Sequence, residues 1–309
     1  MRALAMTGFD AAPTLTDLEV PEPADGEIRV RVRAASVNGF DLAVAAGYTK
    51  DYMEHRFPLV LGKDFAGEVD ALGGDMTGYA VGDRVFGSVT KPYVGDGSFA
   101  EYVTVPTTVG IAPLPESISF TDAAALGLAG AAAHGIIDAA ALQPDQTMLV
   151  VGATGGVGNQ VVQLAAAAGA RVIATAHTDA ERDLVTQLGA QATVDHTGDL
   201  ASQVRAIAPD GVHVLAHLAG DPGVVELVRD CGRFLSTLLQ SPDQPPSQTV
   251  TVVPVYANPT REVLDRVSHG LAGGDTTVTV QQVFPLDQAQ AALDTFAQGT
   301  LGKVVISTD

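Results

Sequence analysis

A cluster of glycines directly follows four apolar residues, Met148–Val151, and could bring bare backbone against an anion. The cluster consists of Gly152, Ala153, Thr154, Gly155, Gly156, Val157 and Gly158. After it, apolar residues recur at helical spacing, so the pattern predicts a buried strand, a tight turn and a helix. Gly155 lacks the Cβ that would keep a phosphate away, and the helix would add the positive end of its dipole. We therefore expect this turn to hold an anion.

A second apolar run, Arg171–Ala176, follows the helix at the distance that a βαβ unit requires. The two strands indicate a parallel sheet with a right-handed crossover, the usual setting of a dinucleotide-binding turn. The turn departs from the pattern GxGxxG at its first place, where Ala153 stands, and the pattern gains weight only from its βαβ context. We expect a dinucleotide site here; the alternative is a structural turn that binds nothing.

The end of the second strand indicates which dinucleotide is bound. An NAD site usually places Asp or Glu there to accept a hydrogen bond from the ribose, whereas this strand ends in His177 and Thr178. Neutral or cationic groups suit a 2′-phosphate, so NADPH is favoured, and Asp179 keeps NADH as the alternative. Thr178 is also a good N-cap for a helix over 179–188. Arg182 would either reach the phosphate or lie solvated on that helix.

The composition limits the classes of protein that remain. The chain has 309 residues, 46% of them hydrophobic, which is enough for two domains with sizeable cores. Its net charge of −19 disfavours binding to nucleic acid and to anionic membranes. The single cysteine, Cys231, excludes a disulfide framework and a multi-cysteine zinc site. No apolar run is long enough to cross a bilayer, and Met1–Met6 has the pattern of a first strand, so we expect a cytoplasmic protein.

Strand and turn patterns divide the chain into two domains. Up to about residue 115 it alternates short strands such as 27–34 with turns, which predicts an all-β body, a distorted barrel. An alanine-rich helical pattern follows, and strands then alternate with helices as in a doubly wound α/β domain. We expect one domain at 1–117, completed by 270–309, and a second at 118–269.

The last third of the chain adds further elements. The polar, proline-rich segment 241–248 is typical of a loop, and 249–255 of a β-branched strand near a sheet edge. Because an unpaired edge favours pairing with a second copy, we expect a homodimer. A strand at 277–280, a helix at 286–298 and a strand at 302–307 would return the chain to its first domain.

Six motifs, in order along nearly the whole chain, carry a resemblance to a known family. They are Ala35–Asp41, Leu61–Val69, Val81–Gly87, Gly97–Tyr102, Gly152–Gly158 and Gly302–Val305. Each is weak alone, but in this order the chain resembles the medium-chain dehydrogenase/reductase superfamily, in its zinc-free quinone oxidoreductase and enoyl reductase branch. The resemblance implies an α/β protein with a GroES-like distorted β-barrel catalytic domain and a doubly wound Rossmann nucleotide-binding domain.

The zinc-holding members of that superfamily carry a cysteine in the first motif and a His-Glu pair in the second. This chain has Val37 or Asn38, and then Lys63 and Asp64, in those places. A charged ammonium group has no lone pair to give to Zn²⁺, and no thiolate is near in sequence. We therefore assign no metal site and expect hydride transfer without a metal.

The same resemblance points to residues around the substrate and the nicotinamide. Asn38 and Asp41 match that region, and a tyrosine of the following loop corresponds to Tyr48 or Tyr52. A carbonyl acceptor needs a hydrogen-bond donor where negative charge develops, and Asn38, either tyrosine or Lys63 would supply it. Asn38 is the preferred candidate. Asp41 would more readily orient a loop than transfer a proton, and Lys63 would equally serve as the ion-pair partner of an aspartate.

Further cofactor contacts also follow from the resemblance. Related reductases place a tyrosine against the 2′-phosphate where this chain has His196. His177 and His196 would then converge on the phosphate, and binding would weaken as pH rises through their titration. The alternative is two exposed polar histidines. Ala219 and Lys303 are assigned to the same cofactor site.

Together, these observations predict an NADPH-dependent, metal-independent oxidoreductase with its cofactor between two domains. Its acceptor would be a quinone or an α,β-unsaturated carbonyl, although no residue is an obvious acid for protonating an alkene. The alternative from a different class is a non-catalytic NADPH-binding protein of the same fold, with a regulatory or structural role. Both would bind NADPH, and only the enzyme would oxidise it when given quinones or enones.

Overall fold

The structure, a computed structural model, describes residues 1–74, 76–239 and 249–308. The loop expected at 241–248 lies outside the described residues. The chain forms two compact units, a terminal unit (Met1–Ala131 and Asn258–Asp309) and a central unit (Ala132–Ala257). The terminal unit thus extends further than the 1–117 and 270–309 expected for the first domain. The reason is that Leu126, Leu264 and Val267 are buried in one cluster with Phe86 of the β body.

The terminal unit contains most of the strands. Its first part holds β1 (Arg2–Met6), β2 (Thr14–Asp17), β3 (Glu27–Ser36), α1 (Gly39–Ala45), β4 (Glu54–Val60), β5 (Asp64–Leu72), β6 (Arg84–Ser88), β7 (Tyr93–Asp96), β8 (Tyr102–Pro106), β9 (Ile111–Pro113), α2 (Phe120–Ala124) and the start of α3 (Gly127–Ala140). Its second part holds α7 (Arg261–Gly273), β16 (Val280–Pro285), the 3₁₀ helix η2 (Leu286–Gln288), α8 (Ala289–Ala297) and β17 (Lys303–Ser307).

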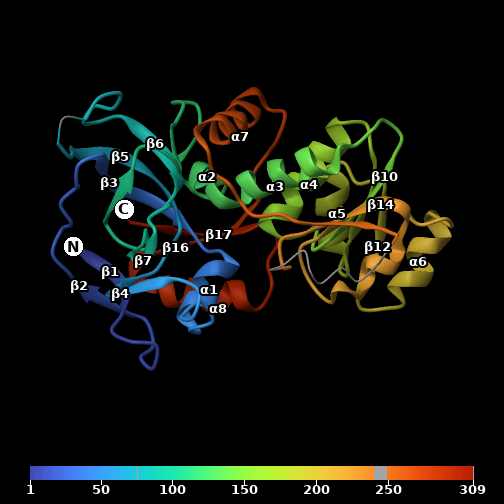
Figure 1. Cartoon of the computed structure of the whole chain (residues 1–309), viewed down its shortest axis with the longest axis horizontal. Helices are drawn as coiled ribbons and strands as arrows, with labels where there is room; N and C mark the ends of the chain where they lie inside the picture. The colour runs from blue at the N-terminus through green and yellow to red at the C-terminus, as the bar shows by residue number, and fades with distance from the viewer. Residues whose placement is uncertain (75, 240–248, 309) are drawn as a thin grey trace. The chain divides into compact units, whose positions relative to one another are not determined.

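Two sheets build this β body within the described residues. One has the order β2-β1-β4-β7, and the other the order β16-β17-β3-β5-β6-β9, with β8 paired to β3. Figure 1 shows the red strand β17 beside the blue strand β3, with which it pairs antiparallel. The predicted return of the chain through 302–307 is therefore confirmed. The strand predicted at 277–280 is wrong, because pairing with β17 begins only at Val280 and continues to Pro285.

Helix α1 was not predicted inside the β-rich first third. Asn38 is its N-cap, and the Asn38 backbone N–H donates to Asp41 Oδ2 at 2.8 Å. A capping residue followed three positions later by an acidic residue is a signature of a helix start. The signal was therefore present in the sequence, in the motif Ala35–Asp41.

The central unit is a parallel sheet with helices packed against its strands. Its elements are the end of α3, β10 (Thr147–Val151), α4 (Gly156–Ala167), β11 (Arg171–Thr175), α5 (Asp179–Gln187), β12 (Ala192–Val194), α6 (Leu200–Ile207), β13 (Val212–His217), the 3₁₀ helix η1 (Pro222–Leu227), β14 (Val228–Ser236) and β15 (Thr251–Pro254). In the described part of the chain the strand order is β12-β11-β10-β13-β14-β15, with every neighbouring pair parallel. This is the doubly wound order of dinucleotide-binding folds.

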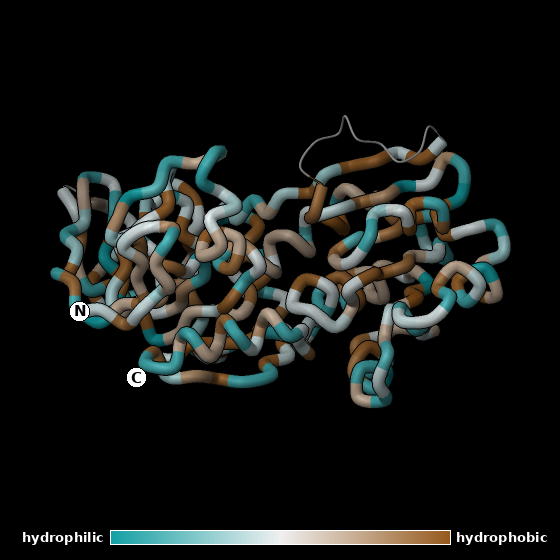
Figure 2. The backbone as a smooth tube through the Cα atoms, turned by 90° about the horizontal axis from the view of Figure 1, so that it is seen from below, coloured by the Kyte–Doolittle hydropathy of each residue, from teal (hydrophilic) through white to brown (hydrophobic). Residues whose placement is uncertain are grey.

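Alternate residues of β10 pack on opposite faces of this sheet, as the period of two along a strand requires. Met148 and Val150 lie in a cluster with Val161 of α4, whereas Leu149 lies in a separate cluster with Val204 of α6. The tube in Figure 2 shows brown, hydrophobic stretches of the chain that alternate with teal, hydrophilic ones. The predicted buried strand and doubly wound domain are confirmed. None of the described helices has the length and apolar character needed to span a membrane.

Candidate functional site

The turn between β10 and α4 presents backbone rather than side chains. Gly155 is the N-cap of α4 and makes no side-chain capping bond, so the first turn of the helix keeps its N–H groups for another partner. A Cβ added at Gly155 would meet only Gly152 O, at 3.6 Å, whereas a Cβ at Gly158 would collide with Gly152 O and the Ala153 backbone. Gly155 therefore leaves space above the turn, and Gly158 allows α4 to pack closely against the turn.

The remaining predicted residues of the turn lie together with it. Gly152 has a φ of +88°, a left-handed conformation that favours glycine. Its N–H donates to Thr175 Oγ1 at 3.0 Å, and a Cβ at Gly152 would lie 3.0 Å from the Cβ of Ala219, which follows β13. Thr154, Gly156 and Val157 are half-buried in the turn. These residues form a turn with the exposed backbone N–H groups that a pyrophosphate needs. We call it the glycine cradle.

The structure brings the two predicted histidines together beyond the end of β11. The ring centroids of His177 and His196 are 6.1 Å apart. His177 Nδ1 is also 3.0 Å from Asp195 Oδ2 and 3.1 Å from Thr197 Oγ1. Hydrogen bonds from Thr197 and His177 hold the pKa of Asp195 well below its usual range. A carboxylate, which the sequence analysis did not consider, therefore already faces one of the two histidines expected to bind the phosphate.

Thr178 and Arg182 organise the same end of the sheet. Thr178 is the N-cap of α5 and accepts a hydrogen bond from the Glu181 N–H at 3.2 Å, as predicted. Arg182 donates to His177 O at 2.7 Å and to Asp179 Oδ1 at 2.9 Å. Its guanidinium therefore links the start of α5 to the residues that follow β11. This is the place where a 2′-phosphate is expected.

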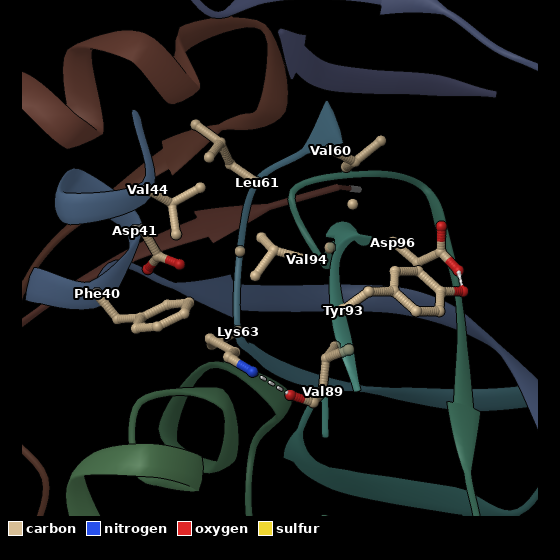
Figure 3. Close-up of a pocket in the computed structure, with 13 residues that line it drawn as sticks. Phe40, Asp41, Val44, Val60, Leu61, Lys63, Val89, Tyr93, Val94 and Asp96 are labelled. Atoms are coloured by element: carbon tan, nitrogen blue, oxygen red, sulfur yellow. Dashed lines mark hydrogen bonds between the residues drawn. The ribbon is translucent and has the colours of Figure 1, made fainter. Parts of the chain in front are cut away.

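A pocket in the terminal unit contains two of the predicted catalytic residues, Lys63 and Asp41 (Figure 3). Phe40, Val89 and Tyr93 also line it, and none of these three is among the predicted catalytic residues. The Lys63 ammonium donates to Val89 O at 2.7 Å and lies 5.0 Å from the Phe40 ring centroid. Its hydrogen bond is thus to a carbonyl rather than to an aspartate. Burial lowers the pKa of Lys63, an effect that the nearby carboxylates oppose.

Asp41 is almost fully buried and serves as the capping partner of Asn38. Burial raises the pKa of Asp41 to about 7, against the effect of the hydrogen bond from Asn38. The orienting role expected for Asp41 therefore has a structural counterpart. A pKa near 7 lies much closer to neutral pH than that of an ordinary aspartate, and this carboxyl group lines the same pocket as Lys63.

The Asn38 side chain is committed to internal partners. Its Nδ2 donates to Ser36 O at 3.2 Å and to Asp64 Oδ2 at 2.9 Å, which uses both amide hydrogens. Its Oδ1 accepts from Lys303 Nζ at 2.7 Å. In this arrangement both amide hydrogens of Asn38 are used within the protein, and neither is free for a substrate carbonyl.

Lys303 lies in the same buried cluster, with only 3% of its surface exposed. Besides Asn38, its ammonium contacts Val37 O at 2.9 Å and lies 3.7 Å from Asp64 Oδ2. The structure therefore does not offer this ammonium to a cofactor, which was its expected role.

Tyr48 and Tyr52 are not among the residues that line the Lys63 pocket. Each is 77% exposed in the turns that follow α1. Val89 and Tyr93, from a more distant segment of the chain, line this pocket.

Comparison with known proteins agrees with this architecture. Residues 24–116 match the family model of the alcohol dehydrogenase GroES-like domain, and residues 156–237 match that of the zinc-binding dehydrogenase. The mouse synaptic vesicle membrane protein VAT-1 homolog-like is 34% identical over 229 residues, which are 72% of this chain and 52% of that protein. Pig quinone oxidoreductase is 26% identical over 99% of this chain and 96% of its own.

Two solved structures extend the comparison over the whole fold. An NAD-dependent alcohol dehydrogenase has a TM-score of 0.88 at 27% identity, covering 100% of both chains. A mycobacterial protein in complex with NADPH has a TM-score of 0.86 at 26% identity, covering 99% of this chain and 100% of that one. The chain belongs to the medium-chain dehydrogenase/reductase superfamily. It spans about half the length of the first curated relatives that it matches.

The zinc that the second family model implies does not fit the residues present. Asp64 accepts from Ser36 Oγ and Asn38 Nδ2 at one oxygen and from the Leu128 N–H at the other. A lysine ammonium lies beside it, and the single cysteine, Cys231, is exposed in the central unit. Over the part of the chain that the structure describes, no group of three or more His, Cys, Asp or Glu side chains could hold a metal ion. A thiolate and imidazole donor set of the kind zinc prefers is therefore not formed here.

Proposed function

We propose that the protein is an NADPH-dependent, metal-independent reductase that transfers a hydride to a quinone or an α,β-unsaturated carbonyl. The observation that carries the proposal is the glycine cradle, with its uncapped helix N-terminus and the open space above Gly155. Pig quinone oxidoreductase, similar to nearly the whole chain, supports the acceptor class.

NADPH rather than NADH is supported by the end of β11. His177, His196 and Arg182 place cationic or protonatable groups there, and no Asp or Glu ends the strand itself. The solved relatives include one in complex with NADPH and one named as NAD-dependent, so the preference for NADPH depends on the residues of this chain. Asp195 and Asp179 pair with His177 and Arg182, so the preference over NADH would be modest.

The reduced nicotinamide would supply the hydride, and the protein would stabilise the negative charge that develops on the acceptor oxygen. Lys63 is the best-placed donor, because its ammonium lines a pocket and two of its hydrogens are not used by Val89 O. Asp41, with its pKa near 7, would take up or release a proton in the same pocket. Asn38 would position the start of α1 rather than touch the substrate.

The test is to mix the purified protein with NADPH, or with NADH, and a panel of ortho-quinones, para-quinones and enones. We expect NADPH oxidation that depends on the acceptor and is unchanged by a chelator. Failure to bind NADPH at any reasonable concentration would refute the proposal. Loss of activity on chelation, followed by recovery with zinc, would contradict its metal-free part.

The alternative is a non-catalytic NADPH-binding protein with a regulatory or structural role. Relatives named as a synaptic vesicle membrane protein homologue and as a reticulon-4-interacting protein have names that state no reaction. Binding of NADPH with no acceptor-dependent oxidation across the panel would favour this alternative.

We further propose a cytoplasmic homodimer. In the described part of the chain, β15 is the last strand of its sheet and is only partly buried. A second copy could extend the sheet there. Light scattering would give the mass of a dimer, and Val252→Lys on β15 should shift it towards the monomer.

A further inference from the structure

The oxygens around Lys303 form a small cage. Val37 O, Asn38 Oδ1 and Asp64 Oδ2 lie 2.9, 2.7 and 3.7 Å from its Nζ. They come from β5 and from the stretch that joins β3 to α1, whereas the lysine comes from β17. We call these three oxygens the Lys303 cage. All four residues are at most 8% exposed.

The hydrogen-bonding partners define the charges in the cage. Every oxygen that faces Nζ can act as an acceptor, so the amine acts as a donor towards the cage, as an ammonium group does. The Asp64 oxygens in turn accept from the Ser36 hydroxyl, the Asn38 amide and the Leu128 N–H, as expected of a carboxylate. Burial lowers the pKa of Lys303 and raises that of Asp64, whereas the attraction between the two groups and the hydrogen bonds to Asp64 favour their charged forms. The hydrogen-bonding pattern fits an ammonium that faces a carboxylate.

Two backbone hydrogen bonds at the start of β17 hold this residue in place. The Lys303 N–H donates to Thr279 O at 2.9 Å, and the Val37 N–H donates to Val304 O at 3.0 Å. Gly302 adopts a φ of +91°, and a Cβ there would collide with Thr279 O. The backbone conformation at Gly302, directly before β17, thus fixes the place of Lys303 beside the cage.

We propose that Lys303 is a tethered cation that positions Asn38 and the start of α1. The side chains of Asn38 and Asp64 face this ammonium from two different segments of the terminal unit. Lys303 is a positioning residue, because its ammonium is enclosed and reaches the Lys63 pocket only through Asn38 and its capping partner Asp41. This inference does not rest on the proposed reductase function.

The test is to remove the tether and offer a free cation. Lys303→Ala deletes the side chain and leaves a channel the size of a short alkylammonium ion, whereas Lys303→Met fills that space without charge. We expect propylammonium chloride to raise the Tm of Lys303→Ala saturably, by about 3 to 5 °C at about ten times its Kd. Potassium chloride at equal ionic strength should not do so. Wild type and Lys303→Met should show no such rise.

Three results would overturn the proposal. Equal stabilisation of Lys303→Ala by propanol and by propylammonium would show that the site accepts any molecule of that size. Stabilisation by Mg²⁺ or Mn²⁺ without stabilisation by the amine would show a site for divalent ions. A Tm of Lys303→Met equal to that of wild type would show that the charge is dispensable.

The proposal can also be tested if Lys303→Ala does not fold without an added cation. Lys303→Ala should then refold in propylammonium and not in potassium chloride, and equal failure in both would count against the proposal. The double variant Asp64→Asn, Lys303→Met removes both charges and should be more stable than Lys303→Met alone. None of these measurements uses NADPH or an acceptor, so their outcome is independent of whether the protein is a reductase.

Discussion

The glycine cradle and the Lys303 cage both hold charge, but they are built in opposite ways. The cradle is made of consecutive residues, 152–158, and of backbone N–H groups at the start of α4. The cage is made of side chains and one carbonyl from residues 37, 38, 64 and 303, which meet only in the folded β body. The first therefore binds through local geometry, and the second depends on the whole terminal unit.

The two sites also differ in the free energy of desolvation that folding requires. Uncapped N–H groups at a solvent-accessible turn remain hydrated until an anion arrives, whereas a buried carboxylate or ammonium loses its hydration permanently. The cage must therefore supply its own counter-charge, and Lys303 does so. We expect substitutions in the cradle to act mainly on ligand binding and those near the cage to act on stability as well.

Breaking the cradle should have the largest effect. Gly158→Val places side-chain atoms against Gly152 O and the Ala153 backbone, so we expect severe destabilisation and no detectable NADPH binding. Gly155→Ala is the matched control, because its added Cβ meets nothing closer than 3.6 Å. It should keep the wild-type Tm and weaken NADPH binding by about tenfold, as measured by fluorescence titration. Equal losses of Tm in both variants would contradict the cradle.

Asp41→Asn should reveal the cost of charge next to the cage. The Asp41 pKa is raised to about 7 in the folded protein, above its value of about 3.9 in an unfolded chain. Ionisation therefore costs folding stability as pH rises from about 4 to about 7, and the wild type should lose up to ~4 kcal/mol relative to the variant over that range. Urea unfolding at several pH values measures this. A difference that stays constant with pH would contradict the burial argument.

Lys63→Met should affect turnover and leave the cradle intact. If its ammonium stabilises the developing oxyanion, kcat/KM for a quinone should fall by about 10²-fold, with the Kd for NADPH unchanged. Lys63→Arg, which keeps the charge, should retain more activity. A loss of NADPH affinity that matches the loss of kcat/KM would contradict this role and would show that Lys63 acts on cofactor binding.

The smallest effect is expected at the end of β11. Asp195→Asn removes the carboxylate that faces His177 at 3.0 Å and competes with a phosphate for it. Because the pair is exposed, the affinity for NADPH should rise only about three- to fivefold, while that for NADH changes little. Titration with both dinucleotides checks this. An equal change in the affinities for NADPH and NADH would show that the 2′-phosphate does not bind beside His177.

The sequence predicted the central unit better than the site in the terminal unit. Residues 148–158 show their strand, turn and helix through apolar spacing and glycines, which act over a few residues. The cage could not be predicted in the same way, since Asn38, Asp64 and Lys303 are separated by up to 265 positions. Lys303 belonged to a recognised motif, but its burial beside Asp64 depends on the pairing of β17 with β3. Likewise, Tyr48 and Tyr52 follow α1 closely in sequence but are exposed.

The late position of β17 along the chain has a consequence for biosynthesis. The ribosome makes residue 303 long after residue 64, and at usual rates of translation the interval is roughly 10 to 50 s. Until β17 joins β3, the nascent β body carries the Asp64 carboxylate without its cation. Folding of the terminal unit is therefore expected to finish only after the central unit has been synthesised, with chaperones shielding the unfinished sheet in the meantime.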